Sequence, residues 1–216
     1  MSDIAALFTW VNIRFLLQGL GMTLLISALA ILCSVVLGTV ISVMRTSNSR
    51  VLRGVATVYI EIFKNTPLLL WIMFTFFVAQ LPPIGAAVLA FTLFTSASVA
   101  EIVRGGIMSI DPGQMEAGRS LGFNYAQTMI YIILPQTFKS VLPALANEFI
   151  VLLKETSVSA YIGLNDLTRG GDIIRGVTYS DFMPLIAVAL VYLVIVVVLS
   201  ACVNQLERRL RKSDRG

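Results

Sequence analysis

Long runs of apolar residues alternate with short polar segments along this chain. The longest uncharged intervals separate Arg14 from Arg45, Lys64 from Glu101, and Asp181 from Glu207. A helix needs roughly 20 apolar residues to cross a bilayer, so each interval is long enough for at least one crossing. The segment Pro82-Pro83-Ile84-Gly85 divides the second interval into two antiparallel crossings, because proline and glycine favour a turn.

The sequence therefore predicts an all-α integral membrane protein with about five transmembrane helices. They are expected at about residues 15–44, 55–81, 84–104, 137–161 and 182–206, within a single transmembrane domain of residues 1–216. Composition agrees with this prediction, since 57% of the 216 residues are hydrophobic, only 13% are charged, and the mean hydropathy is +0.86. These values exclude an ordinary soluble globular protein.

The distribution of basic residues predicts an orientation. An odd number of spans puts the termini on opposite sides, and the side richer in Lys and Arg is normally cytoplasmic. The richer side contains Arg45, Arg50, Arg53, Arg104, Arg119, Lys139 and the basic tail, whereas the other side contains Arg14, Arg169 and Arg175. We therefore expect the C-terminus inside and the N-terminus outside, and the net charge of +4 signals orientation rather than nucleic-acid binding.

A polar segment, residues 111–135, stands between the third and fourth spans. Asp111 is expected to cap a short helix, with Pro112 at its first position and Gln114 completing a capping box. Gly122 is placed to end that helix, since a left-handed conformation is favourable only for glycine. This short helix, from Asp111 to about Leu121, is a candidate surface for a partner.

A second helix is expected to follow the Gly122 turn. Asn124 and Gln127 repeat the capping-box spacing, and the apolar residues after them continue to Pro135. Residues 168–175, between the fourth and fifth spans, combine charges with glycines and are expected to form a surface loop.

Ionisable residues inside spans are costly and usually face a cavity or the protein interior. Glu101 lies on the third span, and Glu148 and Glu155 share one face of the fourth. Two interpretations stay open for these carboxylates, contact with a transported solute or a structural ion pair. Thr66-Pro67 interrupts the second span, either to expose helix ends to a solute or simply to kink the helix.

The sequence lacks the residues that ATP binding, catalysis or metal binding would need. There is no Gly-Lys pair, hence no phosphate-binding loop for ATP, and no histidine. The two cysteines, Cys33 and Cys202, fall in separate predicted spans and are expected to be ordinary apolar side chains. We therefore expect no catalytic residue, no metal and no cofactor in this chain, and any use of ATP would depend on a partner.

The polar segment carries a specific resemblance. Glu116-Ala117-Gly118, then Gly122, then Ile133-Leu134-Pro135 resembles the cytoplasmic coupling signature of bacterial ABC importer permeases. Further stretches similar to the permeases of polar amino-acid importers are residues 63–68, 100–107, 113–117, 134–136 and 154–157. The chain departs from the family where Gly118 replaces the usual alanine and where Ser98 replaces a frequent tyrosine.

This resemblance implies a methionine-permease-like fold in an importer for a polar amino acid or a derivative. The coupling helix would dock on an ABC ATPase dimer through Gln114, Glu116, Ala117, Gly118, Ser120 and Gly122. The substrate pathway would include Thr66, Ser98, Glu101, Glu155, Thr156 and Ser157. The implied partners are a second permease, identical or different, an extracytoplasmic solute-binding protein and the lipid of a bacterial inner membrane.

Two alternatives remain. One is an ion-coupled secondary transporter or channel, which would use the intramembrane carboxylates without an ATPase. The other is an importer of the same architecture for methionine or an opine-like amino-acid derivative.

Overall fold

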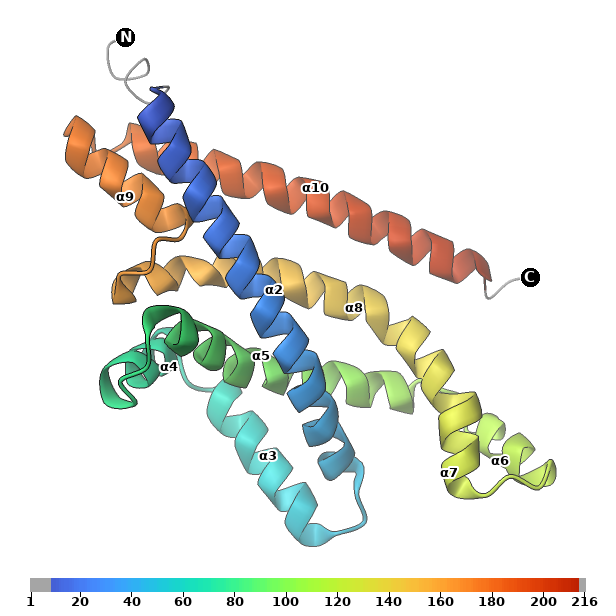
Figure 1. Cartoon of the computed structure of the whole chain (residues 1–216). Coiled ribbons are helices and arrows are strands. Elements are labelled where there is room, and N and C mark those ends of the chain that lie inside the picture. Colours follow the sequence, from blue (N-terminus) through green and yellow to red (C-terminus); the bar gives the residue numbers. More distant parts are fainter. Residues whose placement is uncertain (1–8, 214–216) are drawn as a thin grey trace.

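The computed structural model describes residues 9–213, and every element assigned in that range is a helix (Figure 1). Four helices are long and apolar enough to cross a membrane, namely α2 (Trp10–Thr46), α5 (Pro83–Met108), the continuous helix Tyr125–Ile162, and α10 (Met183–Ser213). A bent pair of shorter helices brings the number of crossings to as many as five. The all-α membrane architecture predicted from the sequence is confirmed.

Helix α2 packs against α5 through a row of small residues, which also meets α9 near the start of α2. The buried members of this row are Gly19, Thr23, Ser27, Ala30, Ser34, Gly38 and Ser42. Small residues let helices approach closely, as is usual in a bilayer. A Cβ at Gly38 would lie 2.7 Å from the Val99 side chain, and the Ser34 hydroxyl donates to the Thr92 carbonyl at 3.2 Å.

The predicted second span is broken in the structure. α3 (Arg50–Lys64) is followed by α4 (Leu68–Met73) and the π-helix η1 (Phe74–Val78), and the two pieces meet at 99°. Pro67 takes the N-cap position of α4, where its missing N–H is not needed, and it disfavours helix at Thr66. The predicted span 55–81 is thus replaced by two helical pieces, Arg50–Lys64 and Leu68–Val78, that meet at the interruption indicated by the sequence.

The predicted fourth span, residues 137–161, is part of a longer helix. That helix comprises α7 (Tyr125–Thr128), the π-helix η2 (Met129–Ile133), α8 (Leu134–Glu155) and the 3-10 helix η3 (Thr156–Ile162). The helix end expected at Pro135 is therefore wrong. The Leu134 N–H bonds to the Met129 carbonyl, five residues back, and this wider turn accommodates Pro135 in the first turn of α8.

Residues 168–175 form no loop; they belong to helix α9 (Leu167–Thr178), which Asp166 caps. Adjacent glycines let α9 fit between two spans. A Cβ at Gly170 would lie 3.0 Å from a backbone oxygen of α2, and one at Gly171 would lie 2.4 Å from a side chain of α10. The expected surface loop is therefore wrong, because glycines that favour a loop locally are required here for close packing.

The fold has two recognisable ends (Figure 1). The C-terminal ends of α2, α5 and α10 lie toward one end, with α6 (Gly113–Ser120), and we call this the coupling end. The start of α2 and helix α9 lie toward the other, the distal end. Basic residues gather on elements of the coupling end, so the charge asymmetry in the sequence coincides with the two ends of the fold.

Candidate functional site

Helix α6 ends at the glycine predicted from the sequence. Gly122 has a φ of +83°, in the left-handed region that favours glycine. The Phe123 N–H donates to the Gly118 carbonyl at 3.1 Å, and the Gly122 N–H donates to the Arg119 carbonyl at 2.9 Å. These two bonds form a Schellman motif, which closes the helix at a fixed point.

The start of α6 differs from the prediction. The helix begins at Gly113 with Pro112 at the cap, and the Asp111 carboxylate accepts from the Gly113 N–H at 2.8 Å. The expected capping box between Asp111 and Gln114 does not form. The Gln114 Oε1 atom instead accepts from Gln136 Nε2 at 3.4 Å, so Gln114 connects α6 to the first turn of α8.

The helix after the turn begins as predicted. Asn124 Oδ1 accepts from the Gln127 N–H, and Gln127 Oε1 accepts from the Asn124 N–H, both at 2.9 Å. This reciprocal capping box fixes the first turn of α7. A short turn thus connects two helices whose facing ends are both held by hydrogen bonds, which gives the segment a defined shape.

The six predicted coupling residues differ in exposure. Glu116, Ala117, Ser120 and Gly122 are exposed, and Gln114 is half-buried. Gly118 is buried, because it faces Thr128 of α7 rather than the outside. Gly118 therefore contributes to packing within this chain, and the exposed side of α6 carries the acidic, small and hydroxyl side chains.

Next to α6 lies an exposed apolar group, of which the sequence reasoning missed Phe123 and Tyr125. Leu121, Phe123 and Tyr125 are 73%, 37% and 59% exposed, and we call them the apolar tip. They occupy every second position through the turn, and large apolar side chains in an otherwise polar segment were the available signal. Exposed apolar residues gathered in this way are typical of a protein contact.

Polar groups from three elements converge deep in the span region. The Glu148 carboxyl of α8 faces the Ser98 hydroxyl of α5 and lies within electrostatic range of Lys64 at the end of α3. Ser98 and Glu148 are both half-buried. We call Lys64, Ser98 and Glu148 the mid-span cluster. The break after α3 positions Lys64 here, and the sequence indicated Glu148 only through its spacing from Glu155.

Of the other predicted pathway residues, Glu155 is the one linked to this cluster. Glu155 is half-buried and interacts electrostatically with Glu148 and Lys154. Thr156 is fully buried, and its hydroxyl donates to the Leu153 carbonyl at 2.7 Å. Two further candidates are half-buried, Ser157 in η3 and Thr66 in the break between α3 and α4.

Glu101 lies elsewhere, at the coupling end of α5. Its carboxylate accepts from Arg45 of α2 and lies 3.4 Å from Arg104, one turn later in the same helix. All three side chains are roughly a quarter to a third exposed. The Glu101 carboxylate thus forms an ion pair between two helices. Of the two interpretations that the sequence left open, contact with a solute or a structural ion pair, this geometry favours the ion pair.

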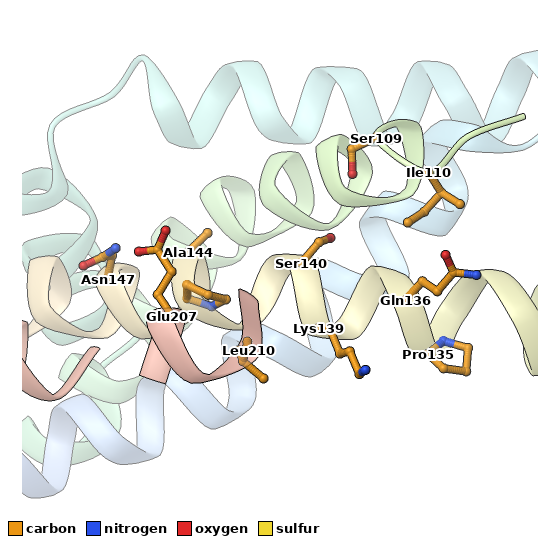
Figure 2. A pocket seen from close by; sticks show the side chains of 11 residues that line it. Ser109, Ile110, Pro135, Gln136, Lys139, Ser140, Ala144, Asn147, Glu207 and Leu210 are labelled. Atoms are coloured by element: carbon orange, nitrogen blue, oxygen red, sulfur yellow. The ribbon is translucent and has the colours of Figure 1, made fainter. Parts of the chain in front are cut away.

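A cavity of about 710 Å³ lies at the coupling end, between the ends of α5 and α10 and the first half of α8. Figure 2 shows Asn147 and Glu207 at one end of it and Gln136 at the other. The six predicted pathway residues are not among its lining residues. Among the described residues, no group of three or more Asp, Glu, Cys or His side chains is placed to hold a metal ion.

At the distal end, Asp166 joins α9 to α2. The carboxylate is fully buried and accepts from the Arg169 N–H at 2.8 Å, while the Leu167 N–H donates to the Thr23 hydroxyl at 3.1 Å. Burial raises the pKa of the Asp166 carboxyl from 3.8 to about 6, against a smaller lowering by hydrogen bonds from Arg169 and Thr168. This group holds the packing of the distal end.

Comparisons with known proteins agree with this arrangement. The chain is 43% identical over 209 residues to the probable glutamine ABC transporter permease GlnM of Bacillus subtilis strain 168, covering 94% of this chain and 96% of that one. It is 38% identical to the arginine transport system permease ArtQ of the same organism and 36% identical to the glutamine permease GlnP of Escherichia coli K12. Each of these two alignments covers 94% of this chain and 95% of the relative.

Solved structures and a family description complete the comparison. A crystal structure of an amino acid ABC transporter with histidines superposes with a TM-score of 0.85 at 42% identity, covering 91% of this chain and 94% of that one. The inward-facing structure of the methionine ABC transporter MetNI superposes with a TM-score of 0.81 at 17% identity. The superposition covers 94% of this chain and 99% of that one, so the two chains share the fold. Residues 30–212 match the family described as binding-protein-dependent transport system inner membrane component. The chain belongs to this family, the permeases of ABC importers.

Proposed function

We propose that this chain is the permease subunit of an importer that moves a polar amino acid and draws its energy from a separate ATPase. The observation that carries the proposal is α6, an exposed helix with a closed C-terminal end, in a chain of this family. Relatives named as glutamine and arginine permeases support a polar amino acid as the substrate. Such a rigid, exposed helix would transmit a movement of the ATPase to the membrane spans of this chain.

The ATPase dimer would grip the exposed side of α6. Small and polar side chains on this side, those of Glu116, Ala117 and Ser120, would let the ATPase approach the helix closely. The exposed side chains of the apolar tip would add apolar area to the same contact. Gln114 and the buried Gly118 hold the helix from behind. ATP would bind to the partner, and this chain would contribute movement rather than a chemical step.

The mid-span cluster would contact the substrate. A free amino acid carries an ammonium and a carboxylate, and the cluster supplies the opposite charge for each, Glu148 for the ammonium and Lys64 for the carboxylate. Ser98 adds a hydroxyl beside Glu148. Thr66, Glu155 and Ser157 would line the approach to this cluster, and the buried Thr156 would support it. Glu101 would act through its ion pair and not by contact with the substrate.

The orientation and remaining partners follow from the same assignment. The coupling end would face the cytoplasm of a bacterial inner membrane, with the N-terminus outside. The distal end would receive the solute-binding protein, a second permease would complete the pathway, and apolar side chains of α2 and α10 would face lipid. Each of these placements is a proposal that rests on the family and on the two ends of the fold.

Reconstitution tests the function directly. The chain would be purified with its ATPase and binding protein, placed in vesicles, and supplied with labelled glutamine, arginine or histidine. We expect uptake of at least one of them that requires ATP and all partners. Uptake that continues without the ATPase and follows an ion gradient would favour a secondary transporter instead.

Variants of two sites separate coupling from substrate contact. Gly122→Val forces a β-branched residue into the left-handed region, and Glu116→Lys reverses the charge of an exposed side chain of α6. Both should lower uptake while the protein still inserts. Glu148→Gln should instead raise the amino-acid concentration needed for half-maximal uptake. Normal uptake by all three variants would remove both assignments.

A further inference from the structure

One side of α3 is polar over its whole length. Arg50, Arg53, Thr57, Glu61 and Lys64 follow one another at intervals of three, four, four and three residues, so they lie on one side of the helix. Four of them are exposed and Thr57 is half-buried. We call these five residues the polar stripe.

The rest of α3 is apolar and has two further sides. Ala56, Ile60 and Phe63 are buried against the neighbouring helices. A third side, beside the polar stripe, exposes the apolar side chains of Val51, Val55, Val58 and Ile62. A helix whose exposed surface is divided in this way meets two different environments, one apolar and one polar.

The depth of the polar stripe shows that its environment is unusual. α3 has 15 residues and is therefore about 22 Å long, and it starts at the coupling end. Its far end meets α4 at the break of the bent pair Arg50–Lys64 and Leu68–Val78, which together are long and apolar enough for one crossing, so Glu61 and Lys64 lie near the middle of that crossing. Charged groups there face protein or water, since contact with lipid tails is too costly.

The polar stripe also continues from the mid-span cluster. Lys64 belongs to both, and beyond it Glu61 accepts from the Asn65 side chain at 2.7 Å. From there Thr57, Arg53 and Arg50 lead toward the coupling end. The polar surface is therefore continuous from the cluster at Glu148 to the end where α6 lies.

We propose that the polar stripe of α3 lines the water-filled route by which the amino acid leaves the mid-span cluster toward the coupling end. This inference rests on the proposed function and assigns residues to its release step. Side chains of both signs solvate a zwitterion along the route without holding it in one place. The apolar side with Val58 and Ile62 faces away from that route.

Thiol accessibility tests the assignment. Cys33 and Cys202 are replaced by alanine, and single cysteines are introduced as Thr57→Cys and Glu61→Cys on the polar stripe or Val58→Cys and Ile62→Cys beside it. The complex with its ATPase is reconstituted, and a charged, membrane-impermeant methanethiosulfonate is added from the ATPase side. Because these reagents need a water-exposed thiolate, we expect modification at 57 and 61 to be at least about tenfold faster than at 58 and 62.

Equal rates at the four positions, or faster rates at 58 and 62, would overturn the proposal. A second pair of variants measures transport. Thr57→Trp should obstruct the route and lower the maximal uptake rate about tenfold, whereas Val58→Trp on the apolar side should leave it within about twofold. Equal uptake by the two tryptophan variants also counts against the route. Uptake by the cysteine-free parent tests the importer function separately, so failure of either idea is recognised on its own.

Discussion

Gly118 of α6 and Thr128 of α7 are in such close contact that a Cβ at position 118 would lie 2.4 Å from Thr128 Cγ2. The contact holds α6 against the start of the long helix that continues as α8. It also favours glycine over alanine at position 118. The larger Thr128 side chain fills the space that a methyl group at 118 would need.

Gly118→Ala is therefore expected to be destabilising despite its better helix propensity. Overpacking of this kind costs typically about 1–3 kcal/mol, and it should displace α6 and reduce ATP-driven uptake. Adding Thr128→Ala removes the two closest atoms and leaves the Cβ of residue 128 at 3.1 Å, so the double variant should recover most of the loss. Thermal unfolding and uptake of the reconstituted complex would measure both effects.

Gly105→Ala on α5 is the matched control, because a Cβ there meets nothing within 4 Å. It should leave unfolding and uptake near those of the parent. A double variant at 118 and 128 that is no better than Gly118→Ala alone would contradict the steric explanation.

The pair of Arg45 and Glu101 gives a second prediction. Arg45→Glu places two carboxylates together between α2 and α5. It should lower the free energy of unfolding by about 1–2 kcal/mol, a value between those typical of losing an exposed and a buried ion pair. Combining it with Glu101→Arg restores opposite charges and should recover part of the stability and of the uptake. Recovery of stability without any uptake would instead show that Glu101 itself is needed for transport.

Two glycines of α2 provide a third prediction. A Cβ at Gly19 would lie 2.4 Å from the Asp166 carbonyl oxygen, and since this atom is backbone, α9 would have to move. A Cβ at Gly21 meets nothing within 4 Å. Gly19→Ala should therefore lower the unfolding temperature by several degrees, as expected for roughly 1–3 kcal/mol, and Gly21→Ala should not. Equal effects would show that α9 is not held at this point.

Much of the fold could be predicted from the sequence, because membrane spans and helix ends are encoded by residues that are close together in the chain. The uncharged intervals located α2, α5 and α10, and the Gly122 turn and the box at Asn124 form as predicted. These features depend on a few consecutive residues. Longer-range packing adds little to them.

The errors arose where tertiary contacts override local preference. Pro135 indicated a helix end, but a π-helical turn accommodates it, and the glycines at 170 and 171 indicated a loop although they pack a helix between two spans. Gln114 bonds to Gln136, 22 residues away, rather than capping its own helix. The mid-span cluster also joins three separate elements, so spacing along one helix could not reveal it.

The buried Asp166 gives the last prediction, which concerns pH. Its pKa in the folded protein is about 6, above the ordinary 3.8, so the folded state binds the proton more tightly than the unfolded state does. The stabilising effect of that proton is complete below about pH 4 and is lost as the pH rises through 6. Asp166→Asn keeps a capping side chain and has no such titration. The stability of the parent relative to Asp166→Asn should therefore fall between pH 4 and pH 7, by about 3 kcal/mol at most. Unfolding temperatures of both proteins, measured in detergent at several pH values, would show it, and a constant difference between them would refute a raised pKa.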